Sequence, residues 1–376
     1  MQTEPTSSVQ MAAPGRIIYL DNLRVFAMLF GILVHTSTID DYAFSRGIQE
    51  VSDNFRMGTF YAVSGLLSGI VLTKIGYNEF VRRRAKSLLI PFFSALVLLN
   101  SLSVWLVFKV HNPNLEGYDY WDVIAASTTK ENGFNGPVIW SQHLWFLTAL
   151  FAHACFSGPL IWIFSAIQRL RLSKLFGLLP GRLVLSCLAV TVAVLVVAGR
   201  AFFLATFGRV GLSSWIIQSV FAYAPFYALG LYMHLEPSVR NKAESFDTFS
   251  FIVLIVGIAI RFLIPDGGIG WQIVDIVTQN IIVSCSCFLL FHVFATWMAK
   301  QNSIMRKLSR AIYSMYLLHY VVIYIIAFIC MNTMGIRGVG VYIVVAVVTP
   351  VTTFLIHEKV IAKSKALSFM LNGRRV

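Results

Sequence analysis

The sequence predicts an all-α, polytopic membrane protein with about ten transmembrane helices and both termini in the cytoplasm. Three observations lead to this fold class: composition, the length of the apolar runs, and the distribution of basic residues. Of the 376 residues, 57% are hydrophobic and only 12% are charged, with a mean hydropathy of +0.73. Soluble domains carry roughly a quarter charged residues. Because the shortage of charged residues extends over the whole chain, we expect the folded chain to be surrounded by lipid.

Ten apolar runs are each long enough to cross a hydrocarbon core of ~30 Å, which takes about 20 helical residues. They are continuous rather than alternating, as is typical of helices. The first follows a polar tail, residues 1–15, without a small-residue cleavage site behind it, so we expect a retained helix. In chain order the runs lie near 17–37, 56–75, 88–109, 143–166, 183–203, 214–233, 249–265, 271–298, 311–331 and 338–361.

The basic residues predict the orientation, because cytoplasmic segments of membrane proteins are enriched in lysine and arginine. With the N-terminus inside, 21 of the 30 lysines and arginines fall in inner segments and eight in outer ones, with Arg24 inside the first helix. This arrangement predicts that both termini are cytoplasmic. It also explains the net charge of +13, because most of the lysines and arginines would then lie on the inner surface, next to anionic membrane lipid. Nothing in the sequence resembles a soluble nucleic-acid-binding surface.

The chain is predicted to form a single membrane domain, 1–376, without an appended soluble domain. The longest polar interval, 110–142, is expected to be an outer loop, and 362–376 a basic cytoplasmic tail. The segment 76–87 is predicted to be a short amphipathic helix on the inner surface. The five cysteines fall inside predicted helices without zinc-ligand spacing, so no metal site is expected.

The first apolar run contains three ionisable residues, Asp21, Arg24 and His35. Such groups are costly inside a membrane and are therefore functional candidates. Arg24 and His35 are eleven residues apart, which is about 1100° of helix, so they share a face about 16 Å apart along the axis. Asp21 lies on nearly the same face. The structural alternative is that Arg24 extends to lipid phosphate and His35 packs between helices.

Three further polar stretches belong to other predicted helices. Arg56-Met57 to Ser64-Gly65 begins the second helix, Gln142 to Leu147 begins the fourth, and Tyr313 to His319 lies in the ninth. Each has a structural alternative. Trp145 could anchor its helix at the membrane interface, and Ser64-Gly65 could allow a close contact between helices. His319 could be a hydrogen-bonded histidine of the core.

Taken in order, these motifs resemble the acyltransferase-3 family of integral membrane acyltransferases. Tyr19 to Val25 followed by His35 is similar to the family motif of a basic residue, ten positions and a histidine. The other similar motifs are Phe60-x-x-x-Ser64-Gly65, His143-Leu-Trp-Phe-Leu147, Tyr223 to Gly230, and Tyr316-Leu-x-His319. Phe55-Arg56-Met57 and Ser141 to Leu147 look most like the glucans biosynthesis protein C group, which modifies osmoregulated periplasmic glucans. The sequence departs from the family pattern at Ser87, where an arginine three residues after Arg84 is usual.

The resemblance implies transfer of an acyl group, succinyl or acetyl, from cytoplasmic acyl-CoA to a hydroxyl of an extracytoplasmic glucan. His35 is expected to be the general base or an acyl-histidine relay. His143 and Trp145 are expected to bind the acceptor or the developing oxyanion, and His319 and Tyr316 to contact substrate. Arg82, Arg83, Arg84 and Lys86 are assigned to the CoA phosphates, with Arg24 above them.

Two assignments and two functions remain open at this point. Ser64 is either an acyl-relay nucleophile or a packing residue, and Arg56 either pairs with a succinyl carboxylate or faces solvent. An O-acetyltransferase acting on another cell-surface glycan or on a small acceptor would share these motifs. From a different class, a transporter or flippase would line its path with Arg24, His35 and His319, although no internal repeat supports it.

Overall fold

The computed structural model describes residues 17–39, 43–129, 133–169, 179–207, 211–245, 248–264, 268–300 and 302–373. Within these ranges the chain is helical and contains no strand, which confirms the predicted all-α class. The predicted tail 1–15 lies outside the described residues.

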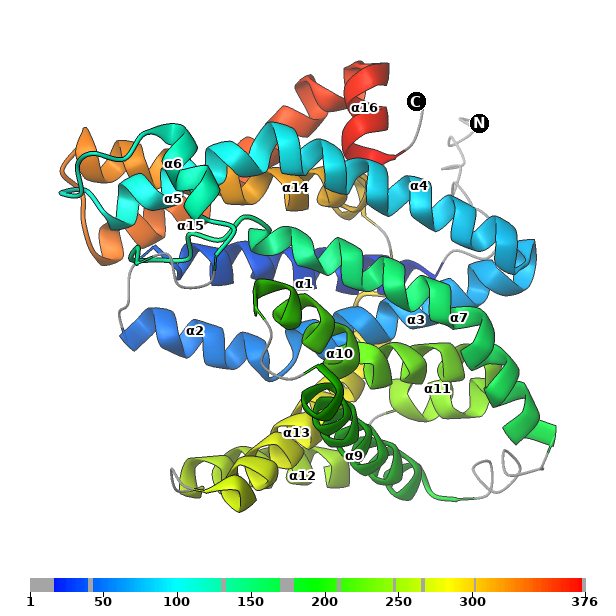
Figure 1. Ribbon diagram of the computed structural model, residues 1–376. Helices are drawn as coiled ribbons and strands as arrows, with labels where there is room; N and C mark the ends of the chain where they lie inside the picture. Colours follow the sequence, from blue (N-terminus) through cyan, green and yellow to red (C-terminus); the bar gives the residue numbers. More distant parts are fainter. Residues whose placement is uncertain are drawn as a thin grey trace, which may run out of the picture.

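Among the described residues, the first half of the chain forms seven of the helices labelled by their order along the chain, with two short helical turns between them (Figure 1). They are α1 (Ile18–Thr36), α2 (Ala43–Asp53), α3 (Arg56–Ile75), α4 (Tyr77–Ala95), the π-helical turn η1 (Leu96–Asn100), α5 (Ser101–His111), α6 (Tyr120–Ala126), the 3-10 turn η2 (Gln142–Leu144) and α7 (Trp145–Arg169).

The second half completes the bundle and returns to α1. Its elements are α9 (Gly181–Phe207), α10 (Gly211–Leu235), α11 (Pro237–Glu244), α12 (Thr248–Leu263), α13 (Ile269–Trp297), α14 (Ser303–Asn332), α15 (Val339–Lys359), η3 (Ile361–Lys363) and α16 (Lys365–Asn372). Helix α14 packs along α1 and α15, and α10 packs along α3.

Nine helices or joined helices among the described residues are long and apolar enough to cross a membrane, and a tenth span arises if α11 and α12, bent by 71°, count as one. This agrees with the predicted number. The lipid-facing side is recognisable because large apolar side chains remain exposed on it, among them Val97 on η1, Trp162 on α7 and Val347 on α15.

Two glycines allow the closest helix contact in the bundle. A methyl group at Gly65 of α3 would overlap the backbone carbonyl of Tyr227 on α10, and one at Gly230 of α10 would overlap the carbonyl of Ala62 on α3. The two backbones therefore touch with no side chain between them, as small residues permit in membrane bundles. This contact fixes the position of α3, whose first turn lines the site.

Several short elements were not expected. The interval between the first two predicted spans, 38–55, contains α2, and the predicted loop 110–142 contains α6. Asp119 and Asp122 form a capping box at the N-terminus of α6. The predicted surface helix 76–87 is not a separate element but the first part of α4, which continues through η1 into α5 without a break. The predicted tail 362–376 contains α16, which Asn372 attaches to Ser314 of α14 through a 2.7 Å hydrogen bond.

Candidate active site

A cavity of about 60 Å³ lies between α1, α3, α7 and α14. Six of the residues predicted from sequence lie in its walls: His35, Arg56, His143, Trp145, Tyr316 and His319. The remaining lining residues are Ala27, Met28, Gly31, Met57, Phe60 and Phe146. Four segments that are distant in the sequence thus supply one small space whose walls combine apolar side chains with three histidines, an arginine and a tyrosine.

Three histidines form a triangle in this cavity. The ring centroids of His35 and His319 are 5.1 Å apart, those of His143 and His319 4.8 Å, and those of His35 and His143 6.2 Å. His143 and His319 are buried, whereas His35 keeps some accessible surface. Among the described residues none hydrogen-bonds to the His35 ring, so its nitrogens are available to a ligand.

The hydroxyl residues that follow His35 end α1 just beyond it. Thr36 Oγ1 donates to the Ile32 carbonyl at 2.9 Å, and Ser37 Oγ donates to the Val34 carbonyl at 2.6 Å. Thr38 Oγ1 donates to the carbonyl of His35 itself at 2.7 Å. Side chains of this type compete for backbone acceptors and favour helix ends. His35 is therefore held in the last turn of α1, where its ring reaches α14.

The backbone of His143 is fixed from both sides. Tyr316 Oη donates to the His143 carbonyl at 2.7 Å. On the other side, Asn100 at the end of η1 donates to the carbonyl of Trp140. Between these anchors Gln142 has φ +37°, in the left-handed region that non-glycine residues rarely adopt. Strained backbone and π-helical turns both concentrate near functional sites.

The hydrogen bond of His319 determines its tautomer. His319 Nδ1 lies 2.5 Å from the carbonyl oxygen of Tyr316. Because a carbonyl only accepts, Nδ1 must donate and carry the ring proton. Nε2 of the neutral ring is then an acceptor, and it is buried without a partner among the described residues. The site thus contains a fixed imidazole lone pair close to His35.

Arg56 brings a positive charge to the same cavity. It is the first residue of α3, and its Nε donates to Ser52 Oγ at 2.8 Å. Its Nη1 lies 3.0 Å from the position that a Cβ at Gly31 would occupy, so the glycine makes room for the guanidinium against α1. No carboxylate of the described residues lies within ion-pair distance of it. The cavity therefore contains a cation without an ion-pair partner among the described residues, and it suits an anionic group.

Three other predicted residues lie outside the cavity walls. Arg24 is one turn before Met28 on α1, with Nη1 4.0 Å from Asp21 Oδ1. Ser64 is one turn beyond Phe60 on α3, beside Gly65, and does not line the cavity. Asp21, Arg24 and Ser64 therefore do not line the cavity, although Arg24 and Ser64 each lie one helical turn from a residue that does.

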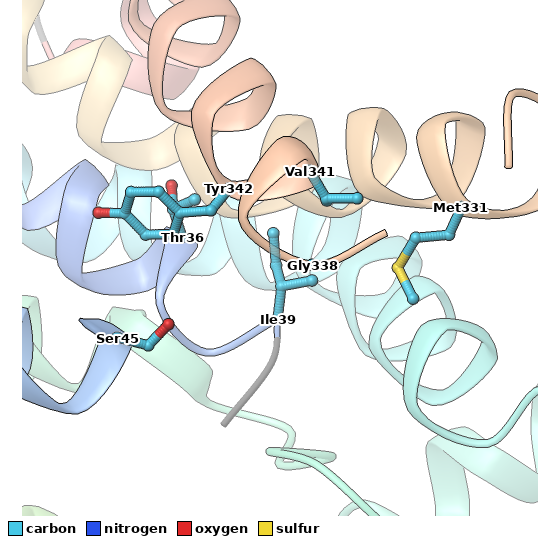
Figure 2. A pocket seen from close by; sticks show the side chains of 7 residues that line it. All are labelled: Thr36, Ile39, Ser45, Met331, Gly338, Val341 and Tyr342. Atoms are coloured by element: carbon cyan, nitrogen blue, oxygen red, sulfur yellow. The ribbon is translucent and has the colours of Figure 1, made fainter. Parts of the chain in front are cut away.

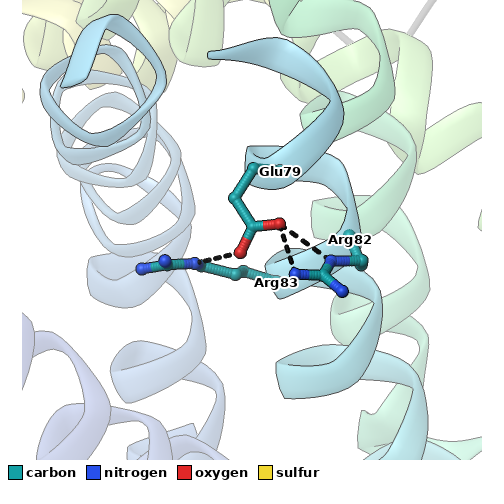
Figure 3. A network of polar contacts seen from close by, with 3 residues as sticks. All are labelled: Glu79, Arg82 and Arg83. Atoms are coloured by element: carbon teal, nitrogen blue, oxygen red, sulfur yellow. Dashed lines mark hydrogen bonds and ion pairs between the residues drawn. The ribbon is translucent and has the colours of Figure 1, made fainter. Parts of the chain in front are cut away.

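The predicted cationic group on α4 divides into two parts. Figure 3 shows the exposed Arg82 and Arg83 on either side of Glu79, with nitrogen–oxygen distances of 2.6 and 2.7 Å. Arg84 instead turns toward α3 and donates to Ser68 Oγ at 3.0 Å. The side chain of Lys86 is exposed. Glu79 thus offsets part of the positive charge that the sequence places here.

Sequence reasoning missed two residues of the site. Gly31 has no side chain to attract attention, although it lies four residues before His35 and borders Arg56. The ring of Tyr320 lies 5.3 Å from that of His35 and stacks on that of His143 at 5.1 Å. Its position directly after His319 was a signal that could have indicated it.

A family model described as an acyltransferase domain matches residues 17–357 of this chain. The chain belongs to this family. Among curated relatives, the chain is 24% identical over 248 residues to glucans biosynthesis protein C of Escherichia coli strain SMS-3-5 / SECEC. The corresponding value for E. coli O17:K52:H18 is 24% over 249 residues, and for E. coli O1:K1 / APEC 23% over 248. Each match covers 60% of this chain and 60% of the relative. No solved structure matches significantly.

These matches confirm the resemblance to the acyltransferase-3 family and to its glucans biosynthesis protein C branch. Family membership supports acyl transfer as the activity. The histidine cavity is therefore the candidate reaction site of an acyltransferase.

The second cavity of this family member has a different character. It holds about 10 Å³ and lies between the end of α1, α2 and the α14–α15 connection, where Figure 2 shows Thr36, Ser45 and Tyr342 around it. This is room for about one water molecule. No histidine, cysteine, aspartate or glutamate lines it, and the described residues hold no group of three such side chains able to bind a metal.

Proposed function

We propose that this chain is a membrane-embedded O-acyltransferase that moves an acyl group from cytoplasmic acyl-CoA to a hydroxyl of an extracytoplasmic glucan. Succinyl is the favoured acyl group and acetyl the alternative. The observation that carries the proposal is the cavity in which three imidazoles and the Arg56 guanidinium meet inside the bundle. The cell inner membrane is the expected location, since only there do cytoplasmic CoA and periplasmic glucan reach one protein.

His35 acts as the general base in this proposal. It takes the proton of the acceptor hydroxyl while the oxygen attacks the thioester carbonyl, which forms the carbon–oxygen bond. The carbon–sulfur bond then breaks, and the thiolate of CoA leaves and takes up the proton from His35. A histidine suits both steps because its ordinary pKa lies near neutrality.

The other imidazoles and Trp145 are assigned to the acceptor and the developing oxyanion. The Nε2 acceptor of His319 faces no competing partner among the described residues, so it is suited to receive a sugar hydroxyl. Tyr316 supports both neighbours, because its hydroxyl holds the His143 carbonyl and its own carbonyl holds His319.

The donor would approach from the opposite end of α1. Arg24 lies about 16 Å from His35 along the helix, and the cavity wall between them passes Met28 and Gly31. Arg82, Arg83, Arg84 and Lys86 on α4 are assigned to the phosphates of CoA, since guanidinium groups bind phosphate bidentately. The pantetheine arm would then run along α1 to bring the thioester to His35.

Arg56 is assigned to the free carboxylate of a succinyl donor. Arg56 is partly buried and has no carboxylate within ion-pair distance among the described residues, so an acyl group that carries negative charge would gain a charged hydrogen-bond partner there. Acetyl has no such group. Donor selectivity therefore reports directly on Arg56.

We expect Arg56→Gln to lower kcat/KM for succinyl-CoA by about 10²-fold, because one charged contact worth ~3 kcal/mol is lost. The kcat/KM for acetyl-CoA should fall by less than about fivefold, because acetyl has no carboxylate to lose. Purified protein in detergent, with a β-glucan acceptor, would be followed by free CoA thiol. Arg337→Gln, at an exposed arginine before α15, is the matched control and should behave as the native chain.

The outcomes separate the alternatives. An equal loss with both donors would show that Arg56 does not contact the acyl carboxylate. A native chain that prefers acetyl-CoA would favour the O-acetyltransferase, and one that consumes neither donor while folded would contradict acyl transfer from CoA.

A further inference from the structure

The short break between α2 and α3 determines where Arg56 points. Helix α2 ends at Asp53 and α3 begins at Arg56, so only Asn54 and Phe55 connect them. Phe55 N donates to the Ser52 carbonyl at 3.1 Å, and Phe55 has φ −149° and ψ −40°, outside the helical region. A rotation of this turn would redirect the first side chain of α3.

On one side the turn is attached to α1. The ring of Phe55 stacks on that of Phe26 at 5.8 Å and meets that of Phe30 edge to face at 5.0 Å. These contacts are apolar and fix the distance between the turn and α1. They do not by themselves fix the rotation of the backbone about the contact.

On the other side the turn is attached to α12 and α13 through Arg261. Arg261 Nη1 donates to Asn54 Oδ1 at 3.1 Å, and Arg261 Nε donates to Asp275 Oδ1 at 2.9 Å. The Asp275 carboxylate of α13 thus fixes Arg261, and Arg261 fixes the α2–α3 connection at Asn54. Asp53 lies in the electrostatic field of both Arg56 and Arg261, which connects the two cations through one carboxylate.

We propose that Arg261 is a positioning residue for Arg56: its hydrogen bond to Asn54 holds the α2–α3 turn so that the Arg56 guanidinium faces the histidine cavity. The α12–α13 pair, which contributes no residue to the cavity, then controls how the site receives an anionic acyl group. The kinetic part of this inference rests on the proposed function, whereas its structural part does not.

The energetic role of Arg261 in folding is small by comparison. About a third of the side chains of Arg261 and Asp275 is exposed, at 30% and 38%. Ion pairs with this exposure contribute little to stability. Arg261→Gln should therefore fold, and Asn54→Ala removes the same hydrogen bond from the other partner. Arg337→Gln again serves as the matched control.

The first test is hydrogen–deuterium exchange by mass spectrometry on the full chain in detergent. We expect amides of residues 54–59 to exchange about tenfold faster in Arg261→Gln and Asn54→Ala than in the native chain. Peptides from α10 and α14 should be unchanged, as should the control variant. Unchanged exchange at 54–59 in both variants would overturn the inference whatever the activity of the protein.

The second test is a double-mutant cycle with Arg56→Gln, read as kcat/KM for succinyl-CoA. Arg261→Gln should lower this value about tenfold in the native background and by less than about twofold in the Arg56→Gln background. An equal loss in both backgrounds would mean that Arg261 does not act through Arg56. A native chain without activity would contradict the proposed function alone, because the exchange result still decides the role of Arg261.

Discussion

Replacing His35 by alanine is expected to slow acyl transfer by about 10²–10⁴-fold, the range that a positioned general base contributes. His35 is the one histidine of the triangle that keeps accessible surface in the cavity, and its ring lies within 5.1–6.2 Å of the other two. Its loss leaves the anchors of His143 and His319 in place, because both are held by Tyr316. The readout is kcat/KM for thiol release with saturating glucan, together with thermal unfolding in detergent.

His234→Ala provides the matched control for this experiment. His234 is also partly buried, but it lies on α10, where Nε2 is 3.1 Å from Thr73 Oγ1 and away from the cavity. The control should keep activity within about twofold. If His35→Ala retained a third or more of the native rate while a His143 or His319 variant lost it, the base would have to be reassigned.

The second large effect is expected on folding, at the contact of α3 with α10. In Gly65→Ala and Gly230→Ala the new methyl group would overlap a backbone carbonyl of the facing helix, and a backbone cannot rotate away as a side chain can. Overpacking commonly costs 1–3 kcal/mol and more where the neighbour is rigid, so we expect a loss of at least about 3 kcal/mol. Reduced recovery of monodisperse protein and a lower midpoint of thermal unfolding would report it.

The matched control is Gly47→Ala on α2, where a Cβ would meet nothing within 4 Å. That variant should be neutral or slightly stabilising, because alanine is the better helix former. Native-like melting of Gly65→Ala and Gly230→Ala would contradict the close backbone contact described for these helices.

The membrane class and most spans could be predicted because they depend on local composition alone. An apolar run of about 20 residues has one favourable outcome in a bilayer, whatever it packs against. Helix α12 is the instructive exception, since it reaches only 16 residues and forms a span only together with the bent α11. Amphipathic α2 was missed because Arg46, Glu50 and Asp53 lower its apolar content below that of a span.

The site was predictable as a set of residues but not as a geometry. Arg24 and His35 could be placed relative to each other because one helix connects them. The meeting of His35 with His143 and His319 depends on three separate segments, and the strained Gln142 that positions His143 has no sequence signature. Arg56 could be read as a solvent-facing residue, because its inward position depends on the absence of a side chain at Gly31.

The most direct measurement of the central claim is a stoichiometry. Purified chain would be incubated with β-glucan and radiolabelled succinyl-CoA or acetyl-CoA, and the free thiol would be compared with label bound to glucan as an alkali-labile ester. The account predicts one ester for each thiol released, only with acceptor present and at a rate that His35→Ala lowers by about 10²–10⁴-fold. Folded protein that releases no thiol and labels no glucan with either donor would contradict it.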